Sequence, residues 1–393
     1  MNTTTSQLNQ IDASPPSIEA MSSLDEQVFA AILAAAKGVS RADLIEKTEL
    51  PRSTVNASVR KLLDLAAIEE YEMAGSTGGR RAALLRAIPK RDLAFVAELG
   101  TRHARIGISD MSGRVVTATS IPINISAGQS QILEILENKW NELKAQSCPQ
   151  RNISAVGLAV PGPIDNDGFV TGAARMPGWN QTDVRSLLNE RLNLPVFVEN
   201  DARAGAIGEW VRRGEKNDPI LYLKVGSGIG AAWITDGVVH RGSSGFAGEI
   251  THTRISTDSP LPCSCGNTGC LETVASGAAI MRRLQETDLN ISNVAQLIQA
   301  ARNGDYPVVP LVREAGLRIG EVLSGLVNFL NPRQVIIGGS LSQIDALIAG
   351  IRSELYRRCL PMSTSDLTVE PALSRQDAPL IGMAILARER LFY

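Results

Sequence analysis

The feature that most constrains the fold of this chain is an order of strand-like runs that occurs twice between residues 91 and 393. In the first occurrence, three runs with short turns precede a helical pattern and a buried strand: DLAFVAELG (92–100), ARIGISD (104–110), RVVTATSIPI (114–123) and then ISAVGLAV (153–160). The second occurrence has the same order: PILYLKVGSGIG (219–230), AAWITDG (231–237), VVHRG (238–242), helices, and QVIIGG (334–339). Two such halves predict two α/β lobes with a cleft between them.

This repeated order predicts an actin-like (hexokinase-type) α/β architecture for residues 91–393. One lobe is expected over approximately 91–200 and the other over 201–393, with the last helix packing back on the first lobe. The alternative is a single doubly wound sheet, which the early strand meander disfavours because such sheets are built from βαβ units. Residues 1–22 are polar and have too little apolar surface to offset the entropy of ordering, so we expect a disordered tail.

The composition limits the classes of partner. The 393 residues carry a formal net charge of -2, so no global charge favours nucleic acid or an anionic membrane, although a local basic patch stays compatible with it. No apolar run reaches the roughly 18 residues of a membrane span, and the N-terminus has no basic-then-apolar signal pattern. We therefore expect a cytoplasmic protein with no membrane partner.

Three of the five cysteines lie in the stretch CSCGNTGCLE (263–272). In the cytosol such a cluster is more often a metal site than a disulfide, and Gly266 and Gly269 allow the turn that brings the sulfurs together. We expect structural Zn²⁺, with no ligand position left for water, on four ligands: His252, Cys263, Cys265 and Cys270. The alternative is a turn of reduced thiols. Cys148 and Cys359 are interpreted as ordinary buried thiols.

Residues 23–90 have the order of a winged helix-turn-helix domain. Three helical patterns precede two alternating runs that flank a glycine-rich tip: LDEQVFAAILAAA (24–36), RADLIEKT (41–48), RSTVNASVRKLLDL (52–65), IEEYEM (68–73), GSTGGRR (75–81) and AALLRAI (82–88). The alternative is a helical protein-binding module with a solvated polar face.

The third helix and the tip supply the predicted contacts to double-stranded operator DNA. Small and hydrogen-bonding side chains early on that helix suit a major-groove reader, and arginines at the tip suit phosphates or the minor groove. The candidates are Arg52, Ser53, Thr54, Asn56 and Arg60 on the helix, and Gly78, Gly79, Arg80 and Arg81 at the tip.

Along nearly its whole length, the segment after residue 91 resembles the ROK family (repressors, open reading frames and sugar kinases). The resemblance rests on CSCGNTGCLE and on six further motifs in the family's order: PGPID (161–165), MPGW (176–179), ENDARAGAIGE (199–209), VGSGIG (225–230), GEITH (248–252) and LNPRQVIIGG (330–339). The N-terminal domain and the tip GGRR resemble the family's repressor branch, which includes regulators of xylose, glucose or N-acetylglucosamine genes.

The resemblance implies a sugar site. Asn200 would bind sugar hydroxyls, Asp201 would stand at the position of the kinase base, and Glu249 and Glu272 would accept hydrogen bonds from the sugar ring. His252 would be both a zinc ligand and a sugar neighbour. One position departs from the family's G-E-x-G-H motif, because Thr251 stands where a glycine is expected. This departure concerns the local turn rather than the ligand set.

The phosphate loops argue against a kinase. A remnant of the nucleotide site is expected at Gly226, Ser227, Gly228, Gly230, Gly338 and Gly339. Active family kinases carry an Asp-x-Gly-Gly-Thr-like run on the first strand, whereas this chain has Glu98, Leu99, Gly100, Thr101 and Arg102. We expect weak or absent sugar phosphorylation, with Asp201 vestigial.

These observations predict a sugar-responsive transcriptional regulator, most simply a repressor of carbohydrate uptake or catabolism genes. It would bind operator DNA as a homodimer or tetramer and would take a sugar or sugar phosphate as its ligand. The first alternative is an active ATP-dependent sugar kinase with an appended DNA-binding module. The second is a regulator whose body is sequestered by a transport protein.

Overall fold

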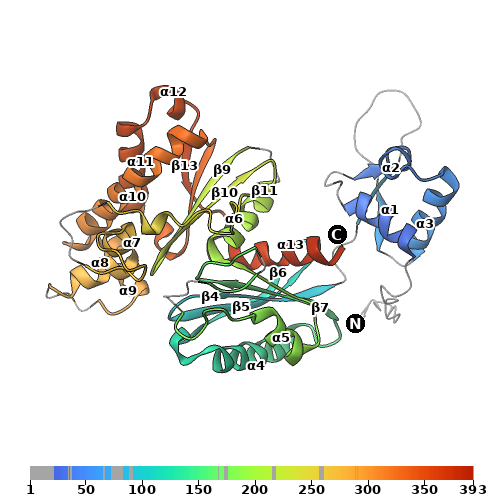
Figure 1. Cartoon of the computed structure of the whole chain (residues 1–393), viewed down its shortest axis with the longest axis horizontal. Coiled ribbons are helices and arrows are strands. Elements are labelled where there is room, and N and C mark those ends of the chain that lie inside the picture. The colour runs from blue at the N-terminus through green and yellow to red at the C-terminus, as the bar shows by residue number, and fades with distance from the viewer. Residues whose placement is uncertain are drawn as a thin grey trace, which may run out of the picture. The chain divides into compact units, whose positions relative to one another are not determined.

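The structure, a computed structural model, describes residues 22–392 except for positions 34, 36–37, 65–66, 72–82, 88–91, 167, 172–175, 215–217, 256–260, 288 and 290. The chain divides into two compact units, one around Met1–Arg91 and the other of Asp92–Leu391 (Figure 1). Among the described helices, none is both long and apolar enough to cross a membrane.

The first unit consists of three helices and a small antiparallel sheet. The helices are α1 (Ser23–Leu33), α2 (Arg41–Thr48) and α3 (Arg52–Asp64), and the sheet has the order β1 (Val39–Ser40), β3 (Leu84–Ala87), β2 (Ile68–Tyr71). Its core is aliphatic, with Val28, Leu44, Val55, Val59, Leu62 and Leu85 buried. A capping box between Ser40 and Asp43 begins α2. The two-residue strand β1 was not predicted.

A buried acid joins α3 to α1. Asp25 accepts hydrogen bonds from Ser58 Oγ and Lys61 Nζ on α3, each at 2.7 Å. Burial alone would raise the pKa of Asp25, but hydrogen bonds from Lys61, Ser22 and Ser58 hold it well below its usual range. The orientation of α3 in the first unit therefore depends in part on an ionised carboxylate.

The second unit contains two five-stranded sheets with matching topology. The first has the order β6 (Val115–Pro122), β5 (His103–Asp110), β4 (Leu93–Leu99), β7 (Ile153–Val160), β8 (Val196–Asn200). The second has the order β11 (Val238–Val239), β10 (Ile229–Thr235), β9 (Ile220–Val225), β12 (Gln334–Gly338), β13 (Thr368–Pro371). In each sheet an antiparallel meander is followed by two parallel strands, so the predicted duplicated order is confirmed.

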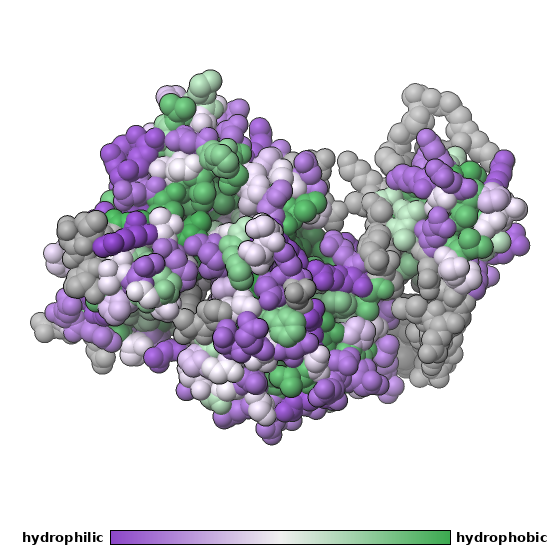
Figure 2. Space-filling view, viewed as in Figure 1, coloured by the Kyte–Doolittle hydropathy of each residue, from purple (hydrophilic) through white to green (hydrophobic). Residues whose placement is uncertain are grey.

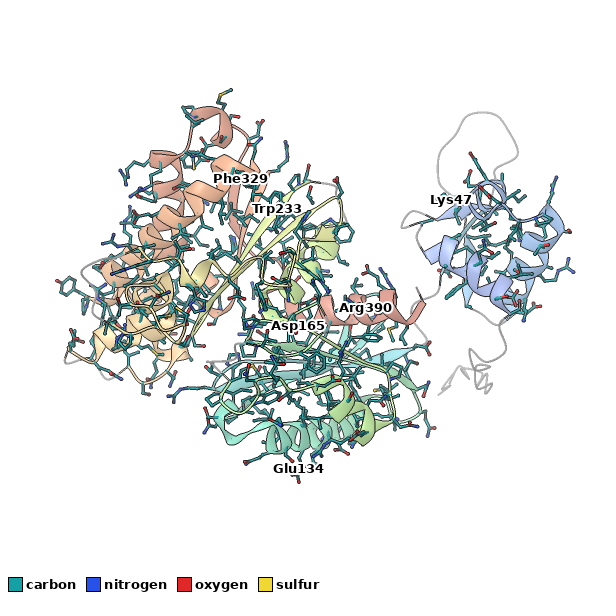
Figure 3. The ribbon with its side chains drawn as sticks, in the orientation of Figure 1. Lys47, Glu134, Asp165, Trp233, Phe329 and Arg390 are labelled. Atoms are coloured by element: carbon teal, nitrogen blue, oxygen red, sulfur yellow. The ribbon has the colours of Figure 1, made fainter. Side chains whose placement is uncertain are left out.

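Helices cover both faces of the first sheet. On one face, α4 (Gln129–Ser147) inserts Trp140, which stacks on Phe95 and donates from its indole nitrogen to the Val96 carbonyl at 3.1 Å. The exposed Glu134 marks the outer side of α4 (Figure 3). α5 (Val184–Leu192) also packs into this core through Val184 and Leu188.

The second sheet carries the larger set of helices. The long pair α10 (Val308–Leu330) and α11 (Asp345–Arg358) packs together, with α7 (Leu271–Ala275), α8 (Gly277–Leu284), α9 (Val294–Asn303) and α12 (Pro361–Thr364) around it (Figure 1). Short 3-10 helices complete the unit: η2 (Ile125–Ala127), η3 (Ile250–His252), η4 (Ser340–Gln343) and η5 (Arg375–Asp377).

Two helices connect the lobes. The last helix, α13 (Ala378–Phe392), lies on the first sheet, where Leu380 and Met383 join the core of Ala94 and Val96. α6 (Asp201–Arg212) packs on the second sheet and crosses α13 with glycines at the contact. A Cβ on Gly208 would lie 1.9 Å from the carbonyl oxygen of Ala378, and one on Gly382 would lie 1.8 Å from that of Ala204. Only glycine fits at this crossing.

Candidate functional site

The second unit contains a cavity of about 1550 Å³ that is lined from both sheets. All five residues expected at a sugar site line it, although they come from three separate segments: Asn200, Asp201, Glu249, His252 and Glu272. Sugars present many hydroxyls and little apolar area, so a cavity with converging amide and carboxylate groups is chemically suited to one.

Both ends of the Asn200 side-chain amide form hydrogen bonds within the protein. Its Oδ1 caps α6 by accepting from the backbone N–H groups of Ala202 at 3.0 Å and Arg203 at 3.2 Å. Its Nδ2 donates to the carbonyl oxygen of Gly162, at 3.2 Å. An amide nitrogen carries two N–H donors, so the side chain has one donor beyond the Gly162 bond.

Asp201 is paired with a lysine that the sequence analysis did not single out. Lys224, at the end of β9, places its Nζ 2.5 Å from Asp201 Oδ2 and 2.5 Å from Glu98 Oε1. Burial opposes the charge on Lys224, but the carboxylates of Asp201 and Glu98 outweigh burial and raise the pKa of the ammonium above its usual value. The Lys224 ammonium thus pairs with both Asp201, at the predicted kinase-base position, and Glu98, at the first-strand position where family kinases carry an aspartate.

Glu272 is fixed by donors from two other segments. Its Oε2 accepts from the Thr251 hydroxyl at 2.6 Å and from the Ile229 backbone N–H at 3.1 Å. Thr251 lies in η3, is 4% exposed, and has no left-handed backbone angle, so the local turn accommodates threonine where the family motif has glycine. Glu249 directly precedes η3 and also lines the cavity.

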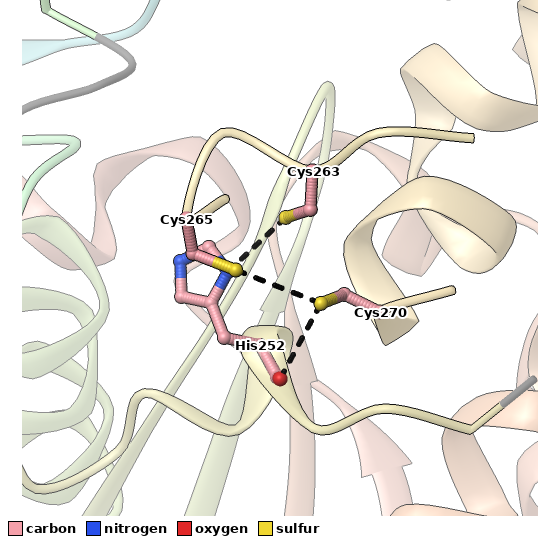
Figure 4. A group of neighbouring side chains, drawn as sticks. All are labelled: His252, Cys263, Cys265 and Cys270. Carbon is pink, nitrogen blue, oxygen red and sulfur yellow. Dashed lines mark hydrogen bonds between the residues drawn. The ribbon is translucent and has the colours of Figure 1, made fainter. Parts of the chain in front are cut away.

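His252 and the three clustered cysteines come together beside the cavity (Figure 4). Their ligand atoms all lie within 4.8 Å of one another, with His252 Nδ1 3.3 Å from Cys263 Sγ and Cys265 Sγ 3.7 Å from Cys270 Sγ. The turn uses left-handed backbone at Gly266 and Gly269, as the sequence predicted. Burial and hydrogen bonds with the Cys265 and Cys263 thiols raise the pKa of Cys270 to about 12, because both favour the protonated thiol. The group can hold a metal ion.

This cluster is directly connected to the proposed sugar ligands. Cys270 directly precedes α7, whose first turn carries Glu272, and the Cys270 thiol donates to the carbonyl oxygen of His252 at 3.4 Å. His252 and Cys265 themselves line the cavity. The other two cysteines, Cys148 and Cys359, are buried away from the cluster.

The phosphate-loop remnant also borders the cavity. Gly226, Ser227, Gly228, Gly230 and Gly339 line it, whereas Gly338 faces the hydroxyl of Tyr222 and does not. The loop carbonyls of Gly226 and Ser227 accept from the backbone N–H groups of Gly277 and Ala278 at the start of α8. Thr101 and Arg102, which stand where a kinase loop has a glycine and a threonine, also line the cavity.

The expected DNA-contacting residues of the first unit are partly described. Arg52, Ser53, Asn56 and Arg60 are exposed on α3, and Thr54 is half-buried. Gly78, Gly79, Arg80 and Arg81 lie outside the described residues.

Comparison with known proteins settles the family. Residues 96–390 match the ROK family. The chain belongs to the ROK family.

Relatives of this ROK protein include regulators and kinases. It is 30% identical over 348 residues to the xylose repressor of Bacillus subtilis (strain 168), covering 88% of this chain and 90% of that one. A ROK family transcriptional regulator, described as a homologue of the E. coli MLC protein, is similar over 94% of this chain and 96% of its own, with a TM-score of 0.74 and 26% identity. A ROK family glucokinase from Streptomyces griseus, solved with glucose and AMPPNP, covers 76% of this chain and 99% of its own, with a TM-score of 0.66 and 27% identity. The predicted actin-like fold and the predicted regulator branch of the ROK family are both confirmed.

Sequence reasoning missed the role of Lys224 in this ROK protein. The signal was present, because Lys224 is the one charged residue in the apolar run ILYLKV (220–225) and lies two residues before Gly226 of the glycine loop. A charge at the end of a buried strand, next to a ligand loop, indicates a buried partner.

Proposed function

We propose that this chain is a sugar-responsive transcriptional regulator, most simply a repressor of genes for carbohydrate uptake or catabolism. One observation carries the proposal. The cavity keeps the amide and carboxylate groups suited to a sugar, but Asp201, at the position of the kinase base, forms an ion pair with Lys224. Xylose repressors and other named regulators among the relatives support the same conclusion.

The first unit would bind double-stranded operator DNA. Its α3 presents two arginines, a serine and an asparagine to solvent, a set suited to phosphates and base edges in the major groove. The unit's order of three helices and a small sheet, with β2 and β3 flanking the predicted glycine-rich tip, agrees with a winged helix-turn-helix module.

The second unit would bind a sugar or sugar phosphate through Asn200, Asp201, Glu249, His252 and Glu272. Acceptors at fixed positions discriminate strongly against analogues that lack a hydroxyl, because a buried acceptor is then left without its donor. Binding would act on DNA affinity only if the sugar favours one arrangement of the protein over another.

The metal at the His252 cluster would be Zn²⁺. Zinc prefers thiolate and imidazole ligands in a tetrahedral shell, and Zn–S bonds of about 2.3 Å separate two ligand sulfurs by about 3.8 Å. The 3.7 Å between Cys265 and Cys270 agrees with that spacing. With four protein ligands the ion would be structural, holding His252 and Glu272 in place.

The presence of Asp201 and of the GSGIG loop favours the kinase alternative. The ion pair between Lys224 and Asp201 disfavours it, and so do Thr101 and Arg102, which line the cavity in place of a kinase loop's glycine and threonine. We expect the purified protein with Mg²⁺ and ATP to phosphorylate none of a panel of hexoses, pentoses and amino sugars in a coupled assay. Robust turnover that disappears in Asp201→Asn would support the kinase instead.

Self-association is expected, since regulators that read palindromic sites commonly bind as dimers. Its candidate surface is apolar: Phe329 at the end of α10 is 85% exposed (Figure 3), and Met362 on α12 is 81% exposed. Hydrophobic side chains gather on the surface over these helices (Figure 2). Exposed patches of this kind commonly mark protein interfaces. A homodimer or tetramer would use this patch for a second copy, and sequestration by a transport protein remains the alternative for the body.

The test of the proposed function uses the full chain. Duplex DNA is selected from a random library, and its affinity is then measured by fluorescence anisotropy with and without D-xylose, D-glucose, N-acetyl-D-glucosamine and their phosphates. We expect a selected duplex to bind with a Kd on the order of 10⁻⁸ M or tighter, and one sugar to change that Kd at least about ten-fold. Failure to select any duplex, or a Kd unmoved by every sugar, would refute the proposal.

A further inference from the structure

In the second unit, the hydroxyl of Thr251 stands at a position where the family motif has no side chain. At Thr251 the G-E-x-G-H motif of the family has glycine, which has no side chain to donate. Here the Thr251 hydroxyl donates to Glu272 Oε2 at 2.6 Å, and both residues line the cavity. The contact joins two segments 21 residues apart, the η3 turn and α7.

The Thr251 contact fixes the orientation of a carboxylate. The same Oε2 also accepts from the Ile229 N–H at 3.1 Å, so two donors from different segments hold one oxygen of Glu272. Hydrogen bonds to an ionised acceptor are among the stronger ones, and two donors on one oxygen restrict rotation about the last side-chain bond. The Thr251 side chain is almost completely buried, which keeps water from replacing its hydroxyl.

We propose that Thr251 is a positioning residue that sets the sugar selectivity of this pocket by locking the Glu272 carboxylate. This inference rests on the proposed function, because it requires a sugar in the cavity. The ligand would be a neutral sugar that donates a hydroxyl to Glu272, since a carboxylate accepts hydrogen bonds and repels anionic groups.

The test compares four variants of the full chain by calorimetric titration with D-xylose, D-glucose and N-acetyl-D-glucosamine, and with monodeoxy forms of whichever sugar binds. Thr251→Val keeps the shape and removes the donor, Thr251→Ser keeps the donor, and Thr251→Gly restores the family residue. Thr253→Val is the matched control, because Thr253 is exposed in the same segment. Metal content and melting temperature are measured for each variant.

We expect Thr251→Val to weaken sugar binding roughly ten-fold, with Thr251→Ser and Thr253→Val within about two-fold of the parent protein. In Thr251→Val and Thr251→Gly, deleting the sugar hydroxyl that faces Glu272 would cost less affinity than in the parent protein. If the role of Thr251 were purely structural, its substitution would lower the melting temperature. The affinity lost on deleting that sugar hydroxyl would then be the same in the variants as in the parent protein.

Two outcomes overturn the inference and are distinguishable. If the parent protein binds a sugar and Thr251→Val keeps both its affinity and its selectivity, only the role of Thr251 is wrong. If the parent protein binds no sugar, the proposed function falls together with the inference.

Discussion

The ammonium nitrogen of Lys224 lies 2.5 Å from Oδ2 of Asp201, so the carboxylate at the kinase-base position already has a cationic partner. A general base must accept a proton from the attacking hydroxyl, and a carboxylate oxygen bound to an ammonium is a poor acceptor for it. Glu98 shares the same ammonium at 2.5 Å. The pocket therefore keeps the family's acidic groups in an arrangement suited to holding a ligand rather than to transferring a phosphoryl group.

Removal of Lys224 is expected to destabilise the second unit. Glu98 and Asp201 are both less than 10% exposed, and Lys224→Ala would leave two buried carboxylates without their shared cation. Breaking a buried pair costs about 3–5 kcal/mol, whereas removing Asp201 as well should cost less than the sum of the two single changes, with a coupling of about 1–3 kcal/mol. Urea unfolding of Lys224→Ala, of a variant lacking Asp201 and of the double variant measures these free energies and their coupling.

The matched control for Lys224 is Lys139→Ala. Lys139 also lies 2.5 Å from a carboxylate, that of Glu142, but this pair is on the exposed side of α4. Its loss should change the unfolding free energy by at most about 0.5 kcal/mol. Equal effects at the two lysines would contradict a buried ion pair at Lys224.

Loss of the proposed zinc is expected to abolish the proposed sugar binding before it unfolds the chain. Cys270→Ser should remove one equivalent of zinc, measured by mass spectrometry, because a three-ligand site binds more weakly. Since Cys270 directly precedes α7, the sugar-induced rise in melting temperature should disappear while the circular dichroism in the far ultraviolet is retained. Cys148→Ser, at a buried thiol outside the cluster, should keep both the zinc and the sugar response. Full sugar response in metal-free protein would refute the positioning role of the metal.

Substitutions on α3 should separate two kinds of DNA contact. Arg60→Ala is expected to weaken all duplexes similarly and to reduce the slope of log K against log salt by about 1, as for the loss of one phosphate contact. Asn56→Ala should instead cost about 1–3 kcal/mol on the selected duplex and relax its sequence preference. Arg333→Ala, an exposed arginine of the second unit, is the control. If Arg60 and Arg333 give the same small effect, α3 is not the reading helix.

The first unit should lose stability in acid through Asp25. Because its folded-state pKa is held below that of the unfolded chain, Asp25 stabilises the fold fully above the unfolded pKa of about 3.9, and this contribution declines as pH falls below that value. Calorimetric scans from pH 6 to pH 2 should show a transition whose midpoint decreases over this range. Asp25→Asn should start at a lower midpoint and have a flatter pH dependence; an unchanged pH profile would contradict the assignment.

The parts of the fold that could be predicted from sequence are those that depend on local order. Alternating runs and glycine turns marked the duplicated sheets, and the spacing of Cys263, Cys265 and Cys270 marked the cluster, since short segments determine both. The Lys224 contacts could not be predicted in the same way, because Glu98, Asp201 and Lys224 come from three segments that meet only when the two lobes assemble. The capping role of Asn200 was not predicted, although an asparagine directly before a helix is a common N-cap.

The glycine crossing of α6 and α13 ties the pocket to the far end of the chain. Asp201 opens α6 at the pocket, and two turns later Gly208 touches the backbone of α13 with no side chain between them. Neither helix can gain even a methyl group there without pushing the other away. A rearrangement that tilts α6 at its Asp201 end is therefore expected to move α13, the C-terminal helix, as well.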